Sequence, residues 1–75
     1  MSVDSVDQGL AVRVNGEQRR IRGGISIAGM LGELGLDPAK VAVERNLAIV
    51  PRSTLAQVLV EDGDEYEIVH FVGGG

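Results

Sequence analysis

The stretch LAVRVNGEQRRIR, residues 10–22, decides the fold because it contains the pattern of two strands joined by a tight turn. Large apolar residues occupy every second position of residues 10–14, which is the period of a strand with one buried face. Asn15-Gly16 follows, and this pair is the strongest short signal for a hairpin because both central residues adopt positive φ. We therefore predict a return strand over residues 17–22, with Ile21 facing the core.

A helix is predicted after the hairpin. Ser26 is a suitable N-cap because its hydroxyl can accept an unpaired backbone N–H of the first turn. Ile27, Leu31 and Leu34 recur at the spacing of a single helix face. Gly35 stands where a left-handed C-terminal cap belongs. Because glycines lie inside this segment, the helix should depend on packing against a sheet.

The second half of the sequence predicts three more strands. Val41 and Val43 alternate with other residues in the first of these, and Ile49-Val50 forms the second. Pro51 cannot donate a ladder hydrogen bond, so the Ile49-Val50 strand should lie at a sheet edge. The other expected elements are a turn at residues 45–47, a helical turn over residues 53–58, a turn at Asp62-Gly63-Asp64 and a last strand over residues 66–72.

The order β-β-α-β-β-β predicts an α+β domain with one main helix packed on one face of a mixed sheet. This is the β-grasp order, in which the first and last strands lie side by side and parallel in the middle of the sheet. We assign residues 10–72 to this domain. Residues 1–9 are expected to be a mobile N-terminal extension, and residues 73–75 a flexible glycine tail.

Composition excludes several classes of function. The 75-residue chain has a formal net charge of −4, no cysteine and one histidine, which excludes disulfides, cysteine nucleophiles and thiolate or multi-histidine metal sites. No apolar run approaches the roughly 20 residues of a membrane span, and the first residues lack a signal-peptide pattern. We expect a soluble, cytoplasmic protein that is a monomer when free. Its acidity argues against nucleic acid, whose binding proteins usually carry a basic face.

The final residues Gly73, Gly74 and Gly75 cannot add to a core because they have no side chains to bury. A tail this thin can pass through a channel too narrow for a residue with a Cβ. Its carboxylate is a poor electrophile, but an acyl-adenylate made with ATP could be attacked by sulfur, oxygen or nitrogen nucleophiles. The sequence contains neither a phosphate-binding glycine loop with its lysine nor an acid–base cluster. We therefore expect a substrate of an activating enzyme and not an enzyme.

Motifs that are specific in combination are Val14-Asn15-Gly16, residues 26–36, residues 41–46, Ile49-Val50-Pro51-Arg52-Ser53, residues 59–69 and Val72-Gly73-Gly74-Gly75. In this combination the sequence resembles the ThiS family of sulfur carriers, small ubiquitin-like proteins of thiamine biosynthesis. The resemblance covers residues 12–75. One departure is Leu47, where family members often carry glycine or another turn residue, and it concerns the local turn type.

The resemblance implies a cycle of reactions at the C-terminus. An E1-like adenylating enzyme would use Mg-ATP to adenylate the carboxylate of Gly75. A persulfide sulfur donor would convert the adenylate to a thiocarboxylate. The carrier would then deliver this sulfur to thiazole synthase, which builds the thiazole ring of thiamine. The resemblance implies no cofactor bound to the chain itself.

The last strand also suggests where these enzymes dock. Tyr66 and Ile68 should face the core, which turns Val69 and Phe71 outward beside the tail. Together with Val72 they form a candidate partner-binding patch, because exposed apolar patches often mark interfaces. Scattered apolar side chains are also normal on a surface, so this pattern has a plainer interpretation as well.

Charged residues and the histidine are given plainer interpretations. His70 has no evident partner and is expected to be a partly exposed strand residue. The arginines of the second strand should form a solvated face, and Arg52 either pairs with a partner's acid or caps the edge strand. The acidic cluster near the last turn either steers the chain towards a basic partner or is a solvated loop. Its members are Glu61, Asp62, Asp64, Glu65 and Glu67.

Three alternatives to a thiamine sulfur carrier remain open from the sequence. The small subunit of molybdopterin synthase is another carrier of this fold, although prolines commonly precede its tail where this chain has Val72. A ubiquitin-like modifier would be joined to lysines of other proteins. A plain β-grasp binding module would use its surface and leave the tail without a function.

Overall fold

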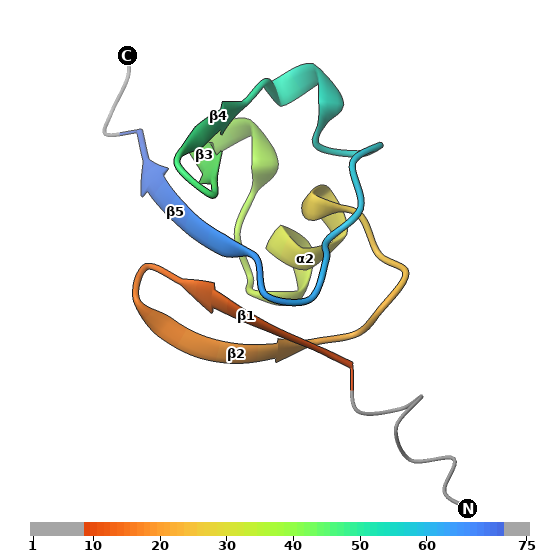
Figure 1. Ribbon diagram of the computed structural model, residues 1–75. Coiled ribbons are helices and arrows are strands. Elements are labelled where there is room, and N and C mark those ends of the chain that lie inside the picture. Colours follow the sequence, from red (N-terminus) through yellow and green to blue (C-terminus); the bar gives the residue numbers. More distant parts are fainter. Residues whose placement is uncertain (1–8, 72–75) are drawn as a thin grey trace, which may run out of the picture.

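The computed structural model describes residues 9–71 (Figure 1). The expectations for the N-terminal extension and for Val72 and the glycine tail concern residues 1–8 and 72–75, which lie outside the described residues. The elements in chain order are β1 (Leu10–Val14), β2 (Glu17–Ile21), α2 (Ile27–Glu33), η1 (Pro38–Lys40), β3 (Val41–Arg45), β4 (Ala48–Val50), η2 (Arg52–Thr54) and β5 (Glu65–His70).

The strands form one sheet in the order β2-β1-β5-β3-β4, with β5 running between β1 and β3 (Figure 1). The β1–β5 pair is parallel, and the other pairs are antiparallel. This arrangement confirms the predicted β-grasp fold with the first and last strands side by side at its centre. It also confirms that the strand before Pro51 lies at an edge.

The core lies between one face of the sheet and α2. Ile27, Met30 and Leu31 are fully buried on the helix, and Tyr66 and Ile68 of β5 are buried opposite them in the same cluster. Burying an apolar side chain of this size stabilises a protein by about 1.5–3 kcal/mol. A helix of 7 residues that contains two glycines is therefore held by this packing rather than by its own propensity.

The predicted caps of α2 are confirmed. The Oγ atom of Ser26 accepts a hydrogen bond from the backbone N–H of Gly29 at 3.0 Å. At the other end Gly35 has a φ of +78°, and its N–H donates to the carbonyl of Gly32. The N–H of Leu36 donates to the carbonyl of Leu31 at 2.8 Å. This pair of bonds is a Schellman motif, which stops the helix at the predicted place.

Element boundaries differ from the predictions where a strand loses its partner. The last strand, predicted over residues 66–72, begins one residue earlier at Glu65, and among the described residues it ends at His70, which pairs with Val41, the first residue of β3. The return strand of the hairpin ends at Ile21 for the same reason, since its partner Leu10 is the first residue of β1.

The helical turn predicted over residues 53–58 begins earlier, as the 3₁₀ helix Arg52–Thr54. A turn follows it and buries Leu55 in the core, as the sequence predicts, while Val58 is half-buried. This segment carries the chain from the β4 edge back to the start of α2, where an isolated bridge pairs Leu59 with Ser26.

Candidate functional site

The candidate docking patch lies at the C-terminal end of β5. Val69 and Phe71 are 60% and 54% exposed, whereas Tyr66 and Ile68 are buried on the opposite face. The predicted alternation of β5 is therefore present. Val72, Gly73, Gly74 and Gly75, which the sequence also marks as site residues, lie outside the described residues. The docking role of the patch stays a prediction.

Phe71 is fixed in place although it follows the last residue of β5. Its backbone N–H donates to the carbonyl of Lys40 at 3.0 Å, so it continues the hydrogen bonding between β5 and the β3 side of the sheet. The guanidinium carbon of Arg52 lies 5.3 Å from the centre of its ring. This distance is within the range of a cation–π interaction, which holds the ring and the guanidinium together.

Arg52 is the one residue that the sequence leaves open between two roles. Its Nη2 atom donates to the carbonyl of Val41 at 3.3 Å, so it binds the start of β3 rather than a free backbone group of the edge strand β4. His70 is exposed beside this group, as predicted. The end of β5 therefore presents an aromatic ring, an aliphatic side chain and a positioned guanidinium to solvent.

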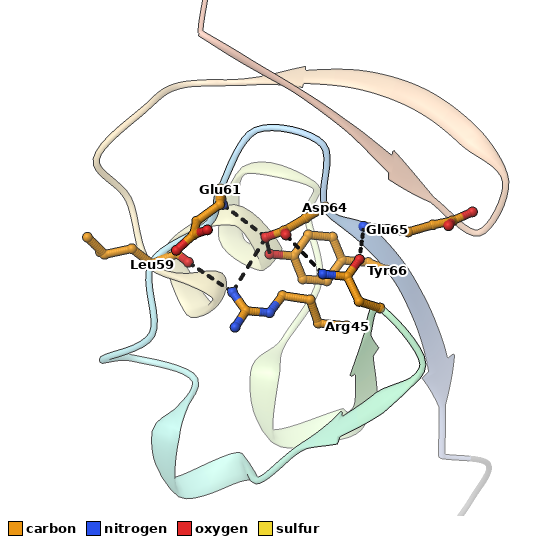
Figure 2. A network of polar contacts seen from close by, with 7 residues as sticks. Arg45, Leu59, Glu61, Asp64, Glu65 and Tyr66 are labelled. Atoms are coloured by element: carbon orange, nitrogen blue, oxygen red, sulfur yellow. Dashed lines mark hydrogen bonds and ion pairs between the residues drawn. The ribbon is translucent and has the colours of Figure 1, made fainter.

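The opposite end of β5 holds a buried polar network, which corrects the sequence interpretation of Asp64 as a member of a solvated acidic cluster. Asp64 is only 6% exposed, and its Oδ2 atom accepts hydrogen bonds from the hydroxyl of Tyr66 at 2.8 Å and from the N–H of Glu61 at 2.9 Å. Figure 2 shows the Asp64 carboxylate between the ring of Tyr66 and the guanidinium of Arg45, whose Nη1 lies 3.5 Å from Oδ2. Arg45 Nη1 also donates to the carbonyl of Leu59 at 3.3 Å.

Asn46 connects this network to β5. Its Nδ2 atom donates to Asp64 Oδ1 at 3.2 Å, and its Oδ1 atom accepts from the N–H of Glu65 at 2.9 Å. Burial alone would raise the pKa of Asp64. The hydrogen bonds from Glu61, Tyr66 and Asn46 and the charge of Arg45 outweigh that effect and hold the pKa below its ordinary value. Burial and the neighbouring carboxylate raise the pKa of Tyr66.

A signal for this network is present in the sequence. The predicted alternation of β5 turns Tyr66 inward, and a buried tyrosine hydroxyl usually needs a hydrogen-bond partner. Asp64 stands two residues earlier and therefore on the same face. The contribution of Arg45 and Asn46 has no such local signal, because they reach Asp64 only through the pairing of β3 with β5.

Neither a metal-binding group nor a membrane-spanning helix is found in the part of the chain that the structure describes. Among residues 9–71 no group of three or more histidine, cysteine or acidic side chains is placed to hold a metal ion. Within the same range no helix is long and apolar enough to cross a membrane.

Comparison with known proteins gives the family of this fold and site. The ThiS family matches residues 12–75. The chain belongs to the ThiS family. A crystal structure of the thiamine biosynthesis protein ThiS from Geobacter metallireducens superposes with a TM-score of 0.73 at 29% identity, covering 88% of this chain and 100% of that one. The sulfur carrier protein ThiS of Bacillus subtilis is 42% identical over 50 residues, which are 67% of this chain and 76% of that protein.

Longer relatives of this ThiS-family chain are thiazole synthases. The thiazole synthase of Paramagnetospirillum magneticum is 58% identical over 62 residues, which are 83% of this chain and 19% of that enzyme. The thiazole synthase of Magnetococcus marinus is 44% identical over 66 residues, which are 88% of this chain and 20% of that enzyme. The chain thus spans about one fifth of the length of these relatives. A ThiS-like segment is part of each of these thiazole synthase chains.

Proposed function

We propose that this chain is a sulfur carrier for the thiazole-forming step of thiamine biosynthesis. The observation that carries the proposal is the ThiS-family match, which runs from Val12 in β1 through the three final glycines. The described geometry is consistent with this role, since the end of β5 is exposed and its last residues are fixed to the sheet. A carrier needs such a rigid base from which to present a thin tail.

The reactive group in this proposal is the carboxylate of Gly75. In the first step, a carboxylate oxygen attacks the α-phosphate of Mg-ATP on an E1-like enzyme, and pyrophosphate leaves. The terminal sulfur of a persulfide then attacks the activated carbonyl, and AMP leaves. Cleavage of the sulfur–sulfur bond by a thiol releases the thiocarboxylate. The chain acts as a co-substrate, and the activating enzyme supplies Mg-ATP and the catalytic groups.

Thiazole synthase is the proposed acceptor of the sulfur. The relatives that carry a ThiS-like segment within a chain named thiazole synthase support this assignment, because covalent linkage places that segment beside the synthase. The partner-binding patch of Val69, Phe71 and Val72 is proposed to contact the enzymes that handle the tail. We propose that the activation of Gly75 and the transfer of sulfur to thiazole synthase both occur in the cytoplasm.

The intact mass of the protein tests this function. The chain is incubated with Mg-ATP, a thiamine-pathway E1-like enzyme and a persulfide donor. We expect the mass gain for replacement of one oxygen by sulfur, located on Gly75 by fragmentation. An unchanged mass, in a reaction where a known ThiS carrier is converted, would contradict the proposal. Conjugates of higher mass on denaturing gels would instead indicate a ubiquitin-like modifier.

A further inference from the structure

An apolar hollow of about 250 Å³ lies beside the base of the tail. Cavities of about 150 Å³ hold a group the size of benzene, so this hollow has room for one leucine or phenylalanine side chain. It lies between β3 on one side and β4, Pro51 and η2 on the other. The residues that line it include Ala42, Ile49, Val50, Pro51, Leu55 and, as its single charged member, Arg52. We call it the Arg52 hollow.

Arg52 has the features of a positioned binding group. Its guanidinium is held by the ring of Phe71 and by the carbonyl of Val41, so both its direction and its position beside Phe71 are fixed. The ion pairs within residues 9–71 are Arg19–Glu17, Arg22–Glu33 and Arg45–Asp64, and none of them includes Arg52. An arginine that is oriented without a carboxylate presents its remaining N–H groups to an external acid.

Charge is also separated along β5 on the face opposite the helix. Glu65 and Glu67 lie towards its start, where Glu44 of β3 stands directly opposite Glu67 and Arg13 of β1 stands beside Glu65, so acidic side chains outnumber basic ones at that end. Lys40 and Arg52 lie at the other end, beside Phe71. In a chain of net charge −4, the base of the tail is thus the cationic end. Charge complementarity favours a partner that carries acid at this point.

The length of the tail decides which partner this is. If Gly75 is the residue that is adenylated, as proposed above, it is the fourth residue after Phe71. Four extended residues span at most about 13–14 Å. The activating enzyme must therefore bring its surface to the end of β5 before any chemistry occurs. The Arg52 hollow lies within that footprint, because Arg52 is in contact with Phe71.

We propose that the Arg52 hollow is a docking site for the activating enzyme, which inserts one apolar side chain there and pairs a neighbouring carboxylate with Arg52. This inference rests on the proposed function and extends it from the exposed patch to a defined contact. In the docked state the ring of Phe71 covers one face of the guanidinium. The carboxylate then approaches its edge, where two parallel N–H groups allow a bidentate pair.

Kinetics of pyrophosphate release test the docking site, with the carrier as the varied substrate. Loss of one partner of an interfacial charge pair costs enough affinity for about a tenfold rise in KM for Arg52→Ala, with kcat changed less than about twofold. Arg52→Glu should raise KM further through repulsion, and Arg52→Lys should restore part of the affinity. Ala42→Leu should raise KM by filling the hollow. Arg22→Ala, which removes an exposed arginine from the other side of the sheet, is the matched control.

The possible outcomes separate a failure of the docking site from a failure of the proposed function. An unchanged KM for Arg52→Ala and Arg52→Glu, with wild-type carrier adenylated normally, overturns the docking site and leaves the proposed function intact. Loss of thiazole synthase binding by the same variants, with adenylation unaffected, assigns the hollow to the other enzyme and also overturns it. If the wild type releases no pyrophosphate, the proposed function fails and the docking inference fails with it. Melting temperatures of all variants exclude misfolding as the cause of a raised KM.

Discussion

The two ends of β5 differ in what their side chains contact. At the start of the strand, Asp64 and Tyr66 are buried, and the carboxylate of Asp64 is hydrogen-bonded by groups from the β3–β4 turn, from β5 and from the loop before β5. At its end, Val69 and Phe71 are more than half exposed, and Arg52 is paired with a ring and a carbonyl rather than with an acid. The start of β5 thus belongs to a region that stabilises the fold, whereas its end belongs to a region whose exposed side chains can still bind a partner.

This difference has a mechanical consequence for a carrier. A C-terminal tail can enter an enzyme accurately only if the residues before it are held, and β5, which leads to the tail of this chain, is a central strand that is paired on both sides. The Asp64 network fixes the register of that strand against the β3–β4 turn through Asn46 and Glu65. We therefore expect substitutions beyond the end of β5 to lower the rate of activation, and substitutions at its start to lower the stability of the fold.

The largest expected effect is at the tail. Gly74→Val should reduce adenylation by at least about a hundredfold, because a side chain there obstructs entry to a site shaped for glycine, and misplacement of reacting groups alone can cost that much. The melting temperature should stay within error of the wild type, since glycine contributes no buried side chain. Pyrophosphate release and thermal unfolding are the two measurements. Normal pyrophosphate release from this variant would contradict the assignment of the tail as the reactive element.

At the start of β5 we expect the opposite result, which is a loss of stability without a loss of adenylation. Asp64→Ala removes the acceptor of Tyr66 and the carboxylate beside Arg45, and it should lower the free energy of unfolding by about 2–4 kcal/mol. At a temperature where the variant remains folded, its adenylation kinetics should match the wild type. Urea unfolding measures the loss. Glu61→Ala is the matched control, because only the backbone N–H of Glu61 takes part in the network. Equal stabilities of the two variants would show that the network contributes little.

A smaller effect of the same carboxylate is expected from its pKa. The pKa of Asp64 is lower in the folded protein than in the unfolded chain, so the unfolded state binds more protons as the carboxylates titrate. The stability from Asp64 is therefore fully present above the unfolded pKa of about 3.9, and it is lost as pH falls through the folded pKa. The melting temperatures of the wild type and Asp64→Asn, measured from neutral pH downwards, should converge in acid. A constant difference across this range would be inconsistent with a charged Asp64 as the stabilising form.

Comparison of sequence and structure shows which interactions have a local signal. Alternation in β5 is enough to predict that Tyr66 is buried and Phe71 exposed, because the direction of a strand side chain depends only on its position. The Asp64 contact with Asn46 spans 18 positions, and it exists because β3 pairs with β5 in one particular register. Arg52 and Phe71 are also far apart in the sequence, and they meet only in the folded chain. The fold, the cap residues and the exposure of Val69 and Phe71 are thus predictable from the sequence, while the polar contacts that Asn46, Arg45 and Arg52 make across the fold are not.

The β3–β4 turn offers the smallest test, because it anchors Asn46 to the network. Asn15-Gly16 and Asn46-Leu47 have the same backbone form, with φ values of 53° and 83° in the first turn and 52° and 73° in the second. A left-handed conformation costs a residue such as leucine about 1–2 kcal/mol, whereas glycine loses about 0.5–1 kcal/mol through its greater freedom when unfolded. Leu47 is 94% exposed, so almost no packing compensates this strain.

Leu47→Gly should therefore raise the free energy of unfolding by about 0.5–1 kcal/mol, the difference between those two costs. Gly16→Ala is the mirror control, since a Cβ at Gly16 would meet no atom within 4 Å and only the backbone strain would change. It should destabilise by about 1 kcal/mol. Urea unfolding of both variants measures the pair. If Leu47→Gly is destabilising, the exposed leucine must contribute a contact in solution, and the turn would then belong with the binding end of the molecule rather than with the structural one.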